Sequence, residues 1–167
     1  MIKALISWAR GMMRRPQQAS AISRIEQAES ELLKLPQLEM PVTHRFAPGV
    51  YAREIFMPAG DAGSLVLGHE HKTEHFNIVL TGRALVSMDG KTEEIVAPCI
   101  FKSGKGVRKA LLIIEDMRWI TIHPTKETDV TKLEDDLVIK SDSFVERQKQ
   151  LQEMKALSAF AKGELVT

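Results

Sequence analysis

The sequence predicts a mainly β protein: an antiparallel β-sandwich or β-barrel with α-helical extensions at both ends. Short apolar runs of strand-like composition crowd residues 42–140, and turn residues rather than helical repeats separate them. Residues 1–41 and 141–167 instead carry apolar residues at steps of three and four, which is typical of helices. We therefore expect a helical N-terminal extension at 1–41, a β-barrel at 42–140 and a C-terminal helix at 141–167.

The N-terminal extension is predicted to contain two helices. Pro16 interrupts an apolar repeat that resumes at residues 20–35 and ends at Pro36. The simplest interpretation is that these helices pack on the protein's own barrel or on a second copy of the chain. Two alternatives stay open: the basic stretch around Trp8 could lie on a membrane surface, or the helices could hold a partner protein.

Composition and charge exclude several classes of protein. The formal net charge is +1, so no positive field favours nucleic acid, and none is expected as a partner. Cys99 is the single cysteine, which rules out a disulfide within the chain and fits a reducing compartment. No apolar run approaches the roughly 18–20 residues of a transmembrane helix. The opening MIKALISWARGMMRR is interrupted by Arg10 and lacks a cleavage site, so we expect a cytoplasmic protein without a transmembrane segment.

Eight apolar runs supply the strands expected in the barrel. Asp89-Gly90 is a strong hairpin signal between two of them, because glycine readily adopts a positive φ. Thr81-Gly82 is interpreted as another turn. In chain order the runs are VYAREIFM, SLVLG, FNIVL, RALVSM, EEIV, CIF, KALLIIE and RWITIH.

A further, weaker hairpin is predicted around Glu115-Asp116. It would pair the apolar run before it with the run after it and place His123 opposite Lys109. With the register shifted by one residue, Arg108 would face His123 instead.

The C-terminal helix has its own start signal. Ser143 and Glu146 fit a capping box, in which a side chain and a backbone N–H at the helix start satisfy each other. The helix would pack on the barrel or across an oligomer interface. The acidic run at residues 134–136 before it is interpreted as a solvated turn.

Three of the chain's five histidines, His69, His71 and His75, lie within seven positions. Neutral imidazole is a good ligand for zinc, iron, manganese and nickel. Alternate residues of a strand share a face, so His69 and His71 can point together, and His75 can return from the neighbouring strand. Glu74 beside it is a further candidate ligand or supporting group. The alternative is a histidine cluster at the mouth of the barrel that holds no metal.

Gly63, His69, His71, His75 and Gly82 fit the spacing G-x5-H-x-H-x3-[E/H]-x6-G. This resembles the first signature motif of the cupin superfamily, whose fold is a small antiparallel barrel of jelly-roll type. The resemblance covers roughly residues 42–140. In that family two histidines and a glutamate bind a divalent metal inside the barrel, and here His75 occupies the glutamate position.

The family's second motif, G-x5-P-x-G-x2-H-x3-N, matches less well. Lys109 stands where its metal-binding histidine would be, after Pro98 and Gly106. His123, brought beside Lys109 by the predicted hairpin, would supply the missing imidazole. The resemblance thus implies a divalent metal (iron, manganese, zinc or nickel) held by His69, His71, His75 and His123.

Two kinds of function are compatible with this resemblance. The first is metal-dependent activity on a small polar substrate, with Glu74 or Lys109 transferring protons. Arg53, Lys102 and Arg108 would line the barrel and hold an anionic ligand. The second is a non-catalytic scaffold or interaction module that assembles through its terminal helices.

The resemblance also bears on assembly and origin. Cupin barrels often pair, so a homo-oligomer, a dimer or higher, is expected. The chain is similar to uncharacterised single-domain cupins of tailed-phage genomes. That likeness would place it in the host cytoplasm or the virion, as a phage structural or host-modulating protein.

Overall fold

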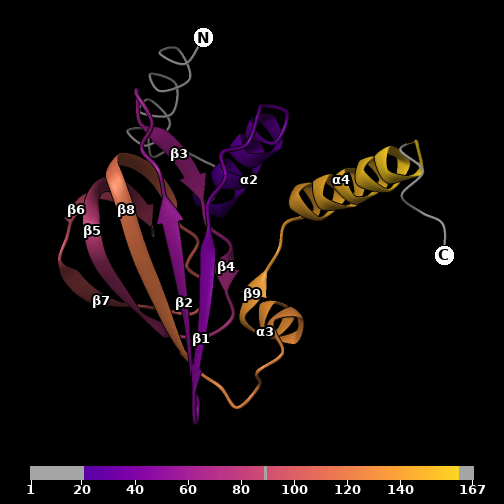
Figure 1. Cartoon of the computed structure of the whole chain (residues 1–167). Helices are drawn as coiled ribbons and strands as arrows, with labels where there is room; N and C mark the ends of the chain where they lie inside the picture. Colours follow the sequence, from indigo (N-terminus) through magenta and orange to yellow (C-terminus); the bar gives the residue numbers. More distant parts are fainter. Residues whose placement is uncertain (1–20, 89, 162–167) are drawn as a thin grey trace.

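The computed structural model of the chain describes residues 21–88 and 90–161 (Figure 1). The first predicted helix and the stretch around Trp8 lie outside the described residues. The described helices are α2 (Ala21–Leu32), α3 (Val130–Leu137) and α4 (Asp142–Ala161). The strands are β1 (Val42–Ala47), β2 (Val50–Met57), β3 (Ser64–Leu67), β4 (Glu70–His71), β5 (His75–Met88), β6 (Lys91–Val96), β7 (Cys99–Ser103), β8 (Ala110–Pro124) and β9 (Val138–Ile139).

Two long strands, β5 and β8, run side by side through the middle of one seven-stranded antiparallel sheet. At one end of this pair, β2 and then β1 continue the sheet beyond β8, and β7 continues it beyond β5. At the other end, β3 pairs with β8 and β6 pairs with β5. Figure 1 shows the sheet curling around its own interior. The predicted mainly β fold, an antiparallel barrel with helical extensions, is confirmed.

Two of the predicted turns are wrong, and both fall in the middle of the long strands. Thr81-Gly82 lies within β5, and Glu115-Asp116 lies within β8, so residues 110–124 form one strand rather than a hairpin. The register of β5 against β8 shifts between Val79 and Ala84, which is where Gly82 lies. The residues that usually mark turns therefore bend two paired strands together and reverse neither of them.

Gly82 shows how the bend is built. Its φ is 93°, and a Cβ placed there would lie 2.7 Å from Met117 Cα and 2.8 Å from the Glu115 carbonyl oxygen. Glycine is the residue that combines a positive φ with so close an approach of two backbones. The side chain of Asp116 accepts a hydrogen bond from the Ala59 backbone N–H at 2.8 Å, which ties the bend to the connection between β2 and β3.

The hairpin at Asp89-Gly90 is confirmed, since Met88 pairs with Lys91 directly across it. The strands it joins contribute to the main core, which lies between the inner faces of the two ends of the sheet. The most deeply buried apolar side chains there are Met57, Val79, Ala84, Val86, Ile113, Met117 and Trp119.

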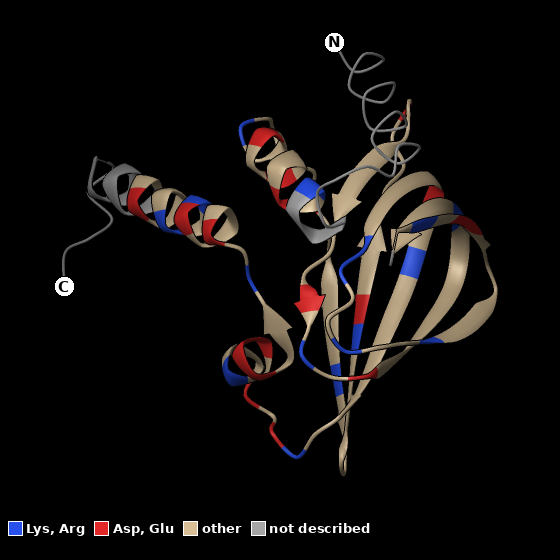
Figure 2. Ribbon diagram, turned by 180° about the vertical axis from the view of Figure 1, so that it is seen from behind, with Lys and Arg blue, Asp and Glu red and all other residues tan. Residues whose placement is uncertain are grey.

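The three described helices lie on one side of the barrel, away from β6 and β7 (Figures 1 and 2). A buried ion pair ties α2 to the barrel: Arg108 Nη2 lies 2.6 Å from Glu29 Oε1, and both side chains are at most 5% exposed. Arg108 also donates to the Gly68 carbonyl, and the Ser141 hydroxyl at the start of α4 donates to the same Glu29 carboxylate. Both extensions are thus anchored at one point beside the histidine segment.

The start of α4 and the segment before it differ from the predictions. Ser141, not Ser143, caps the helix, because its oxygen accepts a hydrogen bond from a backbone N–H of the first turn. The acidic run 134–136 lies in helix α3 rather than in a turn; Asp129 caps that helix by accepting from two of its N–H groups. None of the described helices combines the length and the apolar character that crossing a membrane requires.

Candidate metal centre

Inward-pointing side chains form three rows across neighbouring strands. The first row is polar and titratable, the second carries one cation, and the third is apolar. Because Phe76 pairs with Ile122, His75 and His123 are neighbours in the first row. In the order β2, β8, β5, β7, the rows are Tyr51–His123–His75–Ser103, Arg53–Thr121–Asn77–Phe101 and Ile55–Trp119–Val79–Cys99.

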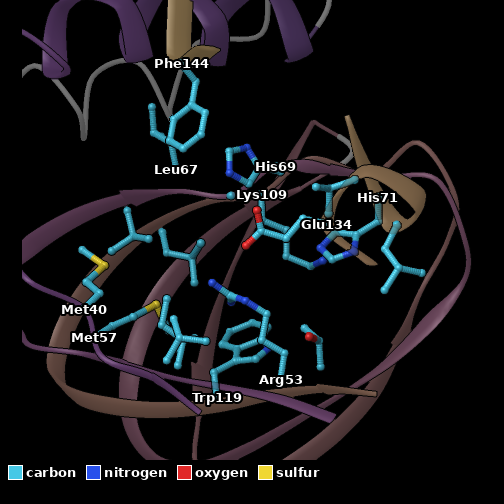
Figure 3. Close-up of a pocket in the computed structure, with 18 of the residues that line it drawn as sticks. Met40, Arg53, Met57, Leu67, His69, His71, Lys109, Trp119, Glu134 and Phe144 are labelled. Carbon is cyan, nitrogen blue, oxygen red and sulfur yellow. The ribbon is translucent and has the colours of Figure 1, made fainter. Parts of the chain in front are cut away.

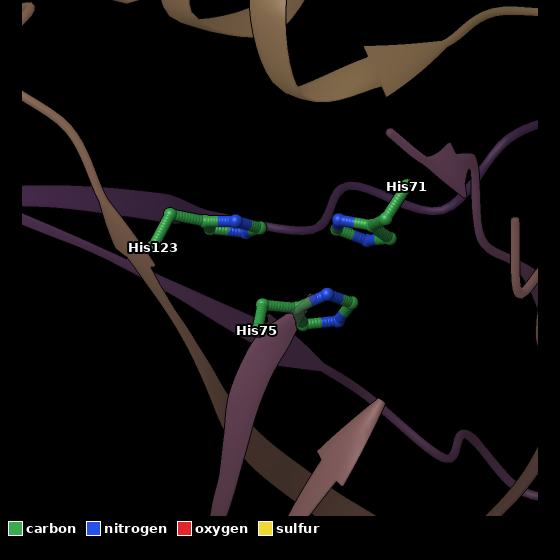
Figure 4. Close-up of side chains that lie close together, drawn as sticks. All are labelled: His71, His75 and His123. Atoms are coloured by element: carbon green, nitrogen blue, oxygen red, sulfur yellow. The ribbon is translucent and has the colours of Figure 1, made fainter. Parts of the chain in front are cut away.

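His71, from the short strand β4, completes a cluster with His75 and His123 (Figure 4). Each of the three residues offers a ring nitrogen, and these nitrogens lie within 4.8 Å of one another. The rings are nearly parallel, with centroids 3.9 Å apart for His71 and His75 and 4.8 Å apart for His75 and His123. His75 and His123 are each 2% exposed, so the cluster is shielded from water on the barrel side.

The backbone of the preceding turn sets the tautomer of His75. Its Nδ1 lies 3.2 Å from the Thr73 carbonyl oxygen, which can only accept, so Nδ1 carries the proton. Nε2 is then left with a lone pair. A histidine that donates from one nitrogen to a carbonyl and presents the other is the usual arrangement in metal sites.

Three nitrogens of the cluster are buried and find no hydrogen-bond partner among the described residues: His71 Nδ1, His75 Nε2 and His123 Nδ1. Most buried polar atoms in proteins are paired, so unpaired ones call for an explanation. A cation among the rings would supply a partner for lone pairs that the described residues leave without one.

Burial keeps the three rings neutral. It lowers the pKa of His71 to about 2, with smaller effects from the charges of His75 and Lys109. It lowers the pKa of His123 to about 4. It also lowers the pKa of His75, although the Thr73 carbonyl opposes this shift. Neutral imidazole is the form that binds metals.

The cluster fits a divalent metal after a small closure. With bonds of about 2.0–2.1 Å, nitrogens around a tetrahedral ion lie roughly 3.4 Å apart, which is closer than the 4.8 Å that spans this cluster. Rotation of the histidine side chains that moves their nitrogens by roughly an ångström would close that gap. Three neutral nitrogen donors without a carboxylate suit the borderline ions zinc, iron and nickel better than the harder ions manganese, magnesium or calcium.

His69 lies outside this cluster. It follows β3 in the connection to β4, and its ring packs edge-on against Phe144 of α4, with centroids 4.6 Å apart. Burial lowers its pKa, and the charge of Glu29 opposes the shift. The structure therefore brings together three of the four histidines predicted to bind metal and directs the fourth toward the helices.

A cavity of about 650 Å³ opens beside the cluster (Figure 3). His71 and His123 line one part of it, and Arg53 and Lys109 line the same space. Much of its remaining wall is apolar. Helices α2, α3 and α4 all contribute to this wall, through side chains that include Leu32, Leu133, Leu137 and Phe144.

The other residues predicted to act on a ligand are divided between this cavity and the exterior. Glu74 and Lys102 pair with each other at 3.0 Å, with 62% and 55% of their side chains exposed. Arg108 is buried but engaged with Glu29. Of the candidates for proton transfer and anion binding, only Lys109 and Arg53 line the cavity.

His123 joins the cluster by a different route from the predicted one. The hairpin that was to bring it beside Lys109 does not exist, because β8 begins at Ala110 and runs unbroken to Pro124. His123 lies instead between Tyr51 of β2 and His75 of β5.

Tyr51 is a feature of the site that the motif analysis missed. It is 2% exposed, its ring stacks on that of His123 with centroids 6.4 Å apart, and its hydroxyl lies 2.7 Å from His44 Nδ1. The alternation of VYAREIFM could have revealed it, since Tyr51 and Arg53 share a face with apolar Ile55.

No protein-family model matches the chain, and its sequence matches no curated protein. Its structure is similar to solved structures of low sequence identity. One is a cupin superfamily protein from Desulfitobacterium hafniense, with 12% identity, a TM-score of 0.45, and 57% of this chain and 85% of that chain covered. An RmlC-like cupin from Methanocaldococcus jannaschii has 14% identity, a TM-score of 0.44 and coverages of 57% and 85%. KdgF from Halomonas sp. has 15% identity, a TM-score of 0.43 and coverages of 57% and 90%.

The fold is assigned by the chain's own features. Two long, bent central strands are flanked by shorter antiparallel partners at each end, and the histidine motif enters the barrel at the start of one of them. The chain has an antiparallel β-barrel fold, and its histidine motif resembles that of the cupin superfamily.

Proposed function

We propose that the protein binds one divalent transition metal through His71, His75 and His123. The observation that carries this proposal is a set of three buried ring nitrogens, all within 4.8 Å of one another, for which the described part of the chain supplies no hydrogen-bond partner. Three protein ligands leave coordination positions for a small molecule. The cavity beside the cluster supports a small-molecule function rather than a purely structural metal site.

We further propose that the bound small molecule is a substrate. The metal, when bound, would supply a Lewis acid for a polar group of that molecule. Lys109, which lines the cavity, is the residue that we assign to proton transfer. Glu74 is the weaker candidate, because it is exposed and paired with Lys102.

The second candidate function is a non-catalytic module, such as a phage structural or host-modulating protein. Its support is the anchoring of both extensions to the barrel through Glu29 and Arg108, which makes the helices part of the folded unit. In this case the barrel would act as a scaffold, and the helices would present the binding surface.

Assembly into a homo-oligomer is compatible with both candidate functions. The outer face of the sheet exposes large apolar side chains on the paired strands β5 and β7: Phe76 and Leu80 on β5, and Ile100 on β7. Contiguous exposed apolar surface of this kind favours association. We propose that a second copy of the chain covers this face.

Metal content tests the proposed site. Protein purified without a histidine tag is loaded in turn with zinc, iron, manganese or nickel, dialysed, and analysed by mass spectrometry of the metal. We expect about one ion per chain in the wild type. We expect loss of most of it in H71A, H75A and H123A, each of which removes one of three ligands.

Two further histidine variants serve as controls. H44A removes a histidine engaged with Tyr51, and H69A removes the one that packs on Phe144, so both should retain the ion. Wild-type protein that retains no metal under any loading condition would contradict the proposal and favour the scaffold. Equal loss in all five variants would show that the ion is held elsewhere.

A further inference from the structure

The cavity beside the histidine cluster is chemically divided along the barrel. The histidine row closes one end, the row that contains Arg53 comes next, and the row of Ile55, Trp119 and Val79 follows. A molecule that fills this space would meet nitrogen donors and a cation at one end and hydrocarbon at the other.

Arg53 is the unusual member of this wall. It lies between Tyr51 and Ile55 on the inward face of β2, and Figure 3 shows its side chain inside the cavity near Trp119. Within residues 21–88 and 90–161 its guanidinium makes no hydrogen bond and no ion pair. A partly buried cation of this kind is costly unless an anion or several acceptors face it.

The acidic side chains nearest to this space are already engaged. Glu134 lines the cavity and acts on Arg53 through space, but its Oε2 lies 3.1 Å from Lys140 Nζ. Glu29 also lines the cavity, but it pairs with Arg108 at 2.6 Å and accepts from Ser141. Neither carboxylate forms an ion pair with Arg53.

We propose that the cavity binds a monocarboxylate with an apolar body, and that Arg53 holds the carboxylate. This goes beyond the proposed metal site, because the anion is bound by a side chain of β2 whether or not the histidines hold an ion. The planar guanidinium can donate two parallel hydrogen bonds to a carboxylate. Thr121, directly across from Arg53, adds a hydroxyl on the same wall.

The apolar part of the cavity determines the chemistry of the ligand beyond its carboxylate. Met40, Met57, Leu65 and Leu111 line it, together with Trp119, and methionine side chains adapt readily to different apolar shapes. A volume of about 650 Å³ is in the range of cavities that enclose ordinary small-molecule ligands. A straight or aromatic hydrocarbon body would lie on these side chains while the carboxylate reaches Arg53.

Three matched probes test the class of ligand. Octanoate, 1-octanol and octylamine share a hydrocarbon chain and differ in the charge of one end. Their binding is measured by calorimetric titration, once with protein stripped by a chelator and once with zinc-loaded protein. We expect octanoate to bind both forms at least about tenfold more tightly than octanol, since a charged hydrogen bond contributes about 1.5–3 kcal/mol. Octylamine should bind most weakly.

Two substitutions at Arg53 and one elsewhere locate the carboxylate. R53Q should weaken the binding of octanoate about tenfold and leave the binding of octanol unchanged. R53K should keep part of the preference for octanoate over octanol because it keeps the charge. R83Q is the matched control: Arg83 pairs with Glu94 and Glu115 outside the cavity, so its loss should change the affinity for neither octanoate nor octanol. The wild-type preference between the three probes needs no variant and holds even if R53Q folds poorly.

The outcomes separate this inference from the metal proposal. Octanoate that binds only zinc-loaded protein, with no loss in R53Q, would overturn the role of Arg53 and leave the metal site standing. Equal affinity for octanoate and octanol, or no binding of either, would overturn the proposed ligand class. Binding of octanoate to stripped protein with loss in R53Q would support the inference even if no metal is ever retained.

Discussion

The carbonyl of Thr73 decides which nitrogen of His75 carries its proton. By accepting from Nδ1 it leaves a lone pair on Nε2, and burial lowers the pKa of all three rings, which keeps them neutral near pH 7. At the scale of single residues, the candidate site thus depends on burial and on one backbone oxygen. Both can be tested without knowing the ligand.

The first residue-scale prediction concerns acid stability of the metal-free protein. His71 and His123 titrate well below their ordinary pKa of about 6.5 when folded, at about 2 and about 4. Between those pH values and pH 6.5, the two histidines are protonated in the unfolded chain and neutral in the folded chain. The free energy of unfolding should therefore be greatest above about pH 6.5 and fall as the pH drops toward 4. Urea unfolding at about pH 7 and about pH 5, with a chelator present, measures it.

A variant isolates the contribution of the histidines from that of the carboxylates. H71N removes one ring that resists protonation, so its unfolding free energy should fall less between the two pH values than that of the wild type. An identical fall in both proteins would mean that His71 does not titrate as its burial implies.

The second residue-scale prediction concerns the bend. G82A would force a positive φ on alanine and drive its methyl group into the backbone of Glu115 and Met117. We expect it to lower the free energy of unfolding by about 2–4 kcal/mol. G90A is the control: its φ is also positive, but apart from its two chain neighbours no described residue has an atom within 4 Å of the added methyl, so it should cost about 1 kcal/mol. Similar costs for both would argue against a tight contact at the bend.

At the scale of elements, the sequence was most informative where strands end in ordinary turns. VYAREIFM is β2 residue for residue, and Asp89-Gly90 joins β5 to β6 as predicted. The errors arose at Gly82 and at Glu115-Asp116, because a glycine or an acidic pair marks a bend as well as a turn. A local pattern cannot separate the two, since the difference lies in whether the partner strand continues.

The histidine motif predicted which residues to inspect, but it could not fix how they meet. Spacing placed His69 and His71 on one face of a strand. In the structure only residues 70–71 of that segment are extended, and the ring of His69 packs on Phe144 of a helix that is far away in sequence. Contacts of this kind depend on how the C-terminal extension docks, which no local pattern encodes.

The element-scale prediction concerns that docking. E29A removes the partner of Arg108 and leaves a guanidinium buried, which should cost about 3–5 kcal/mol. Hydrogen exchange should rise first in α2 and at the start of α4. The control is E31A, which breaks the surface pair with Lys34 and should cost at most about 1 kcal/mol. Equal effects of E29A and E31A would mean that the buried pair does not anchor the helices.

At the scale of the whole molecule, the barrel has two unlike sides. The helices and the cavity occupy one side, and the apolar outer face around Phe76 and Ile100 occupies strands away from them. Ile100 is 65% exposed and Phe76 52%. This division allows the chain to associate through one side while the other admits a ligand.

Light scattering in solution tests the association. A dimer of the 18.7 kDa chain would have a mass of about 37 kDa, which is twice that value. I100E should shift the protein toward the monomer because it places a charge in the proposed contact. M154E, on the exposed surface of α4, should leave the mass unchanged. A wild-type mass of one chain would rule out the proposed pairing.

The most direct test of the central claim is X-ray absorption of the zinc-loaded protein. The proposed site predicts a first shell with three imidazole nitrogens at about 2.0–2.1 Å and no sulfur, completed by an exchangeable oxygen ligand such as water. H71A should show one imidazole fewer or no bound zinc. A first shell of oxygen alone, or one that includes the sulfur of Cys99, would contradict the assignment of the cluster as a metal centre.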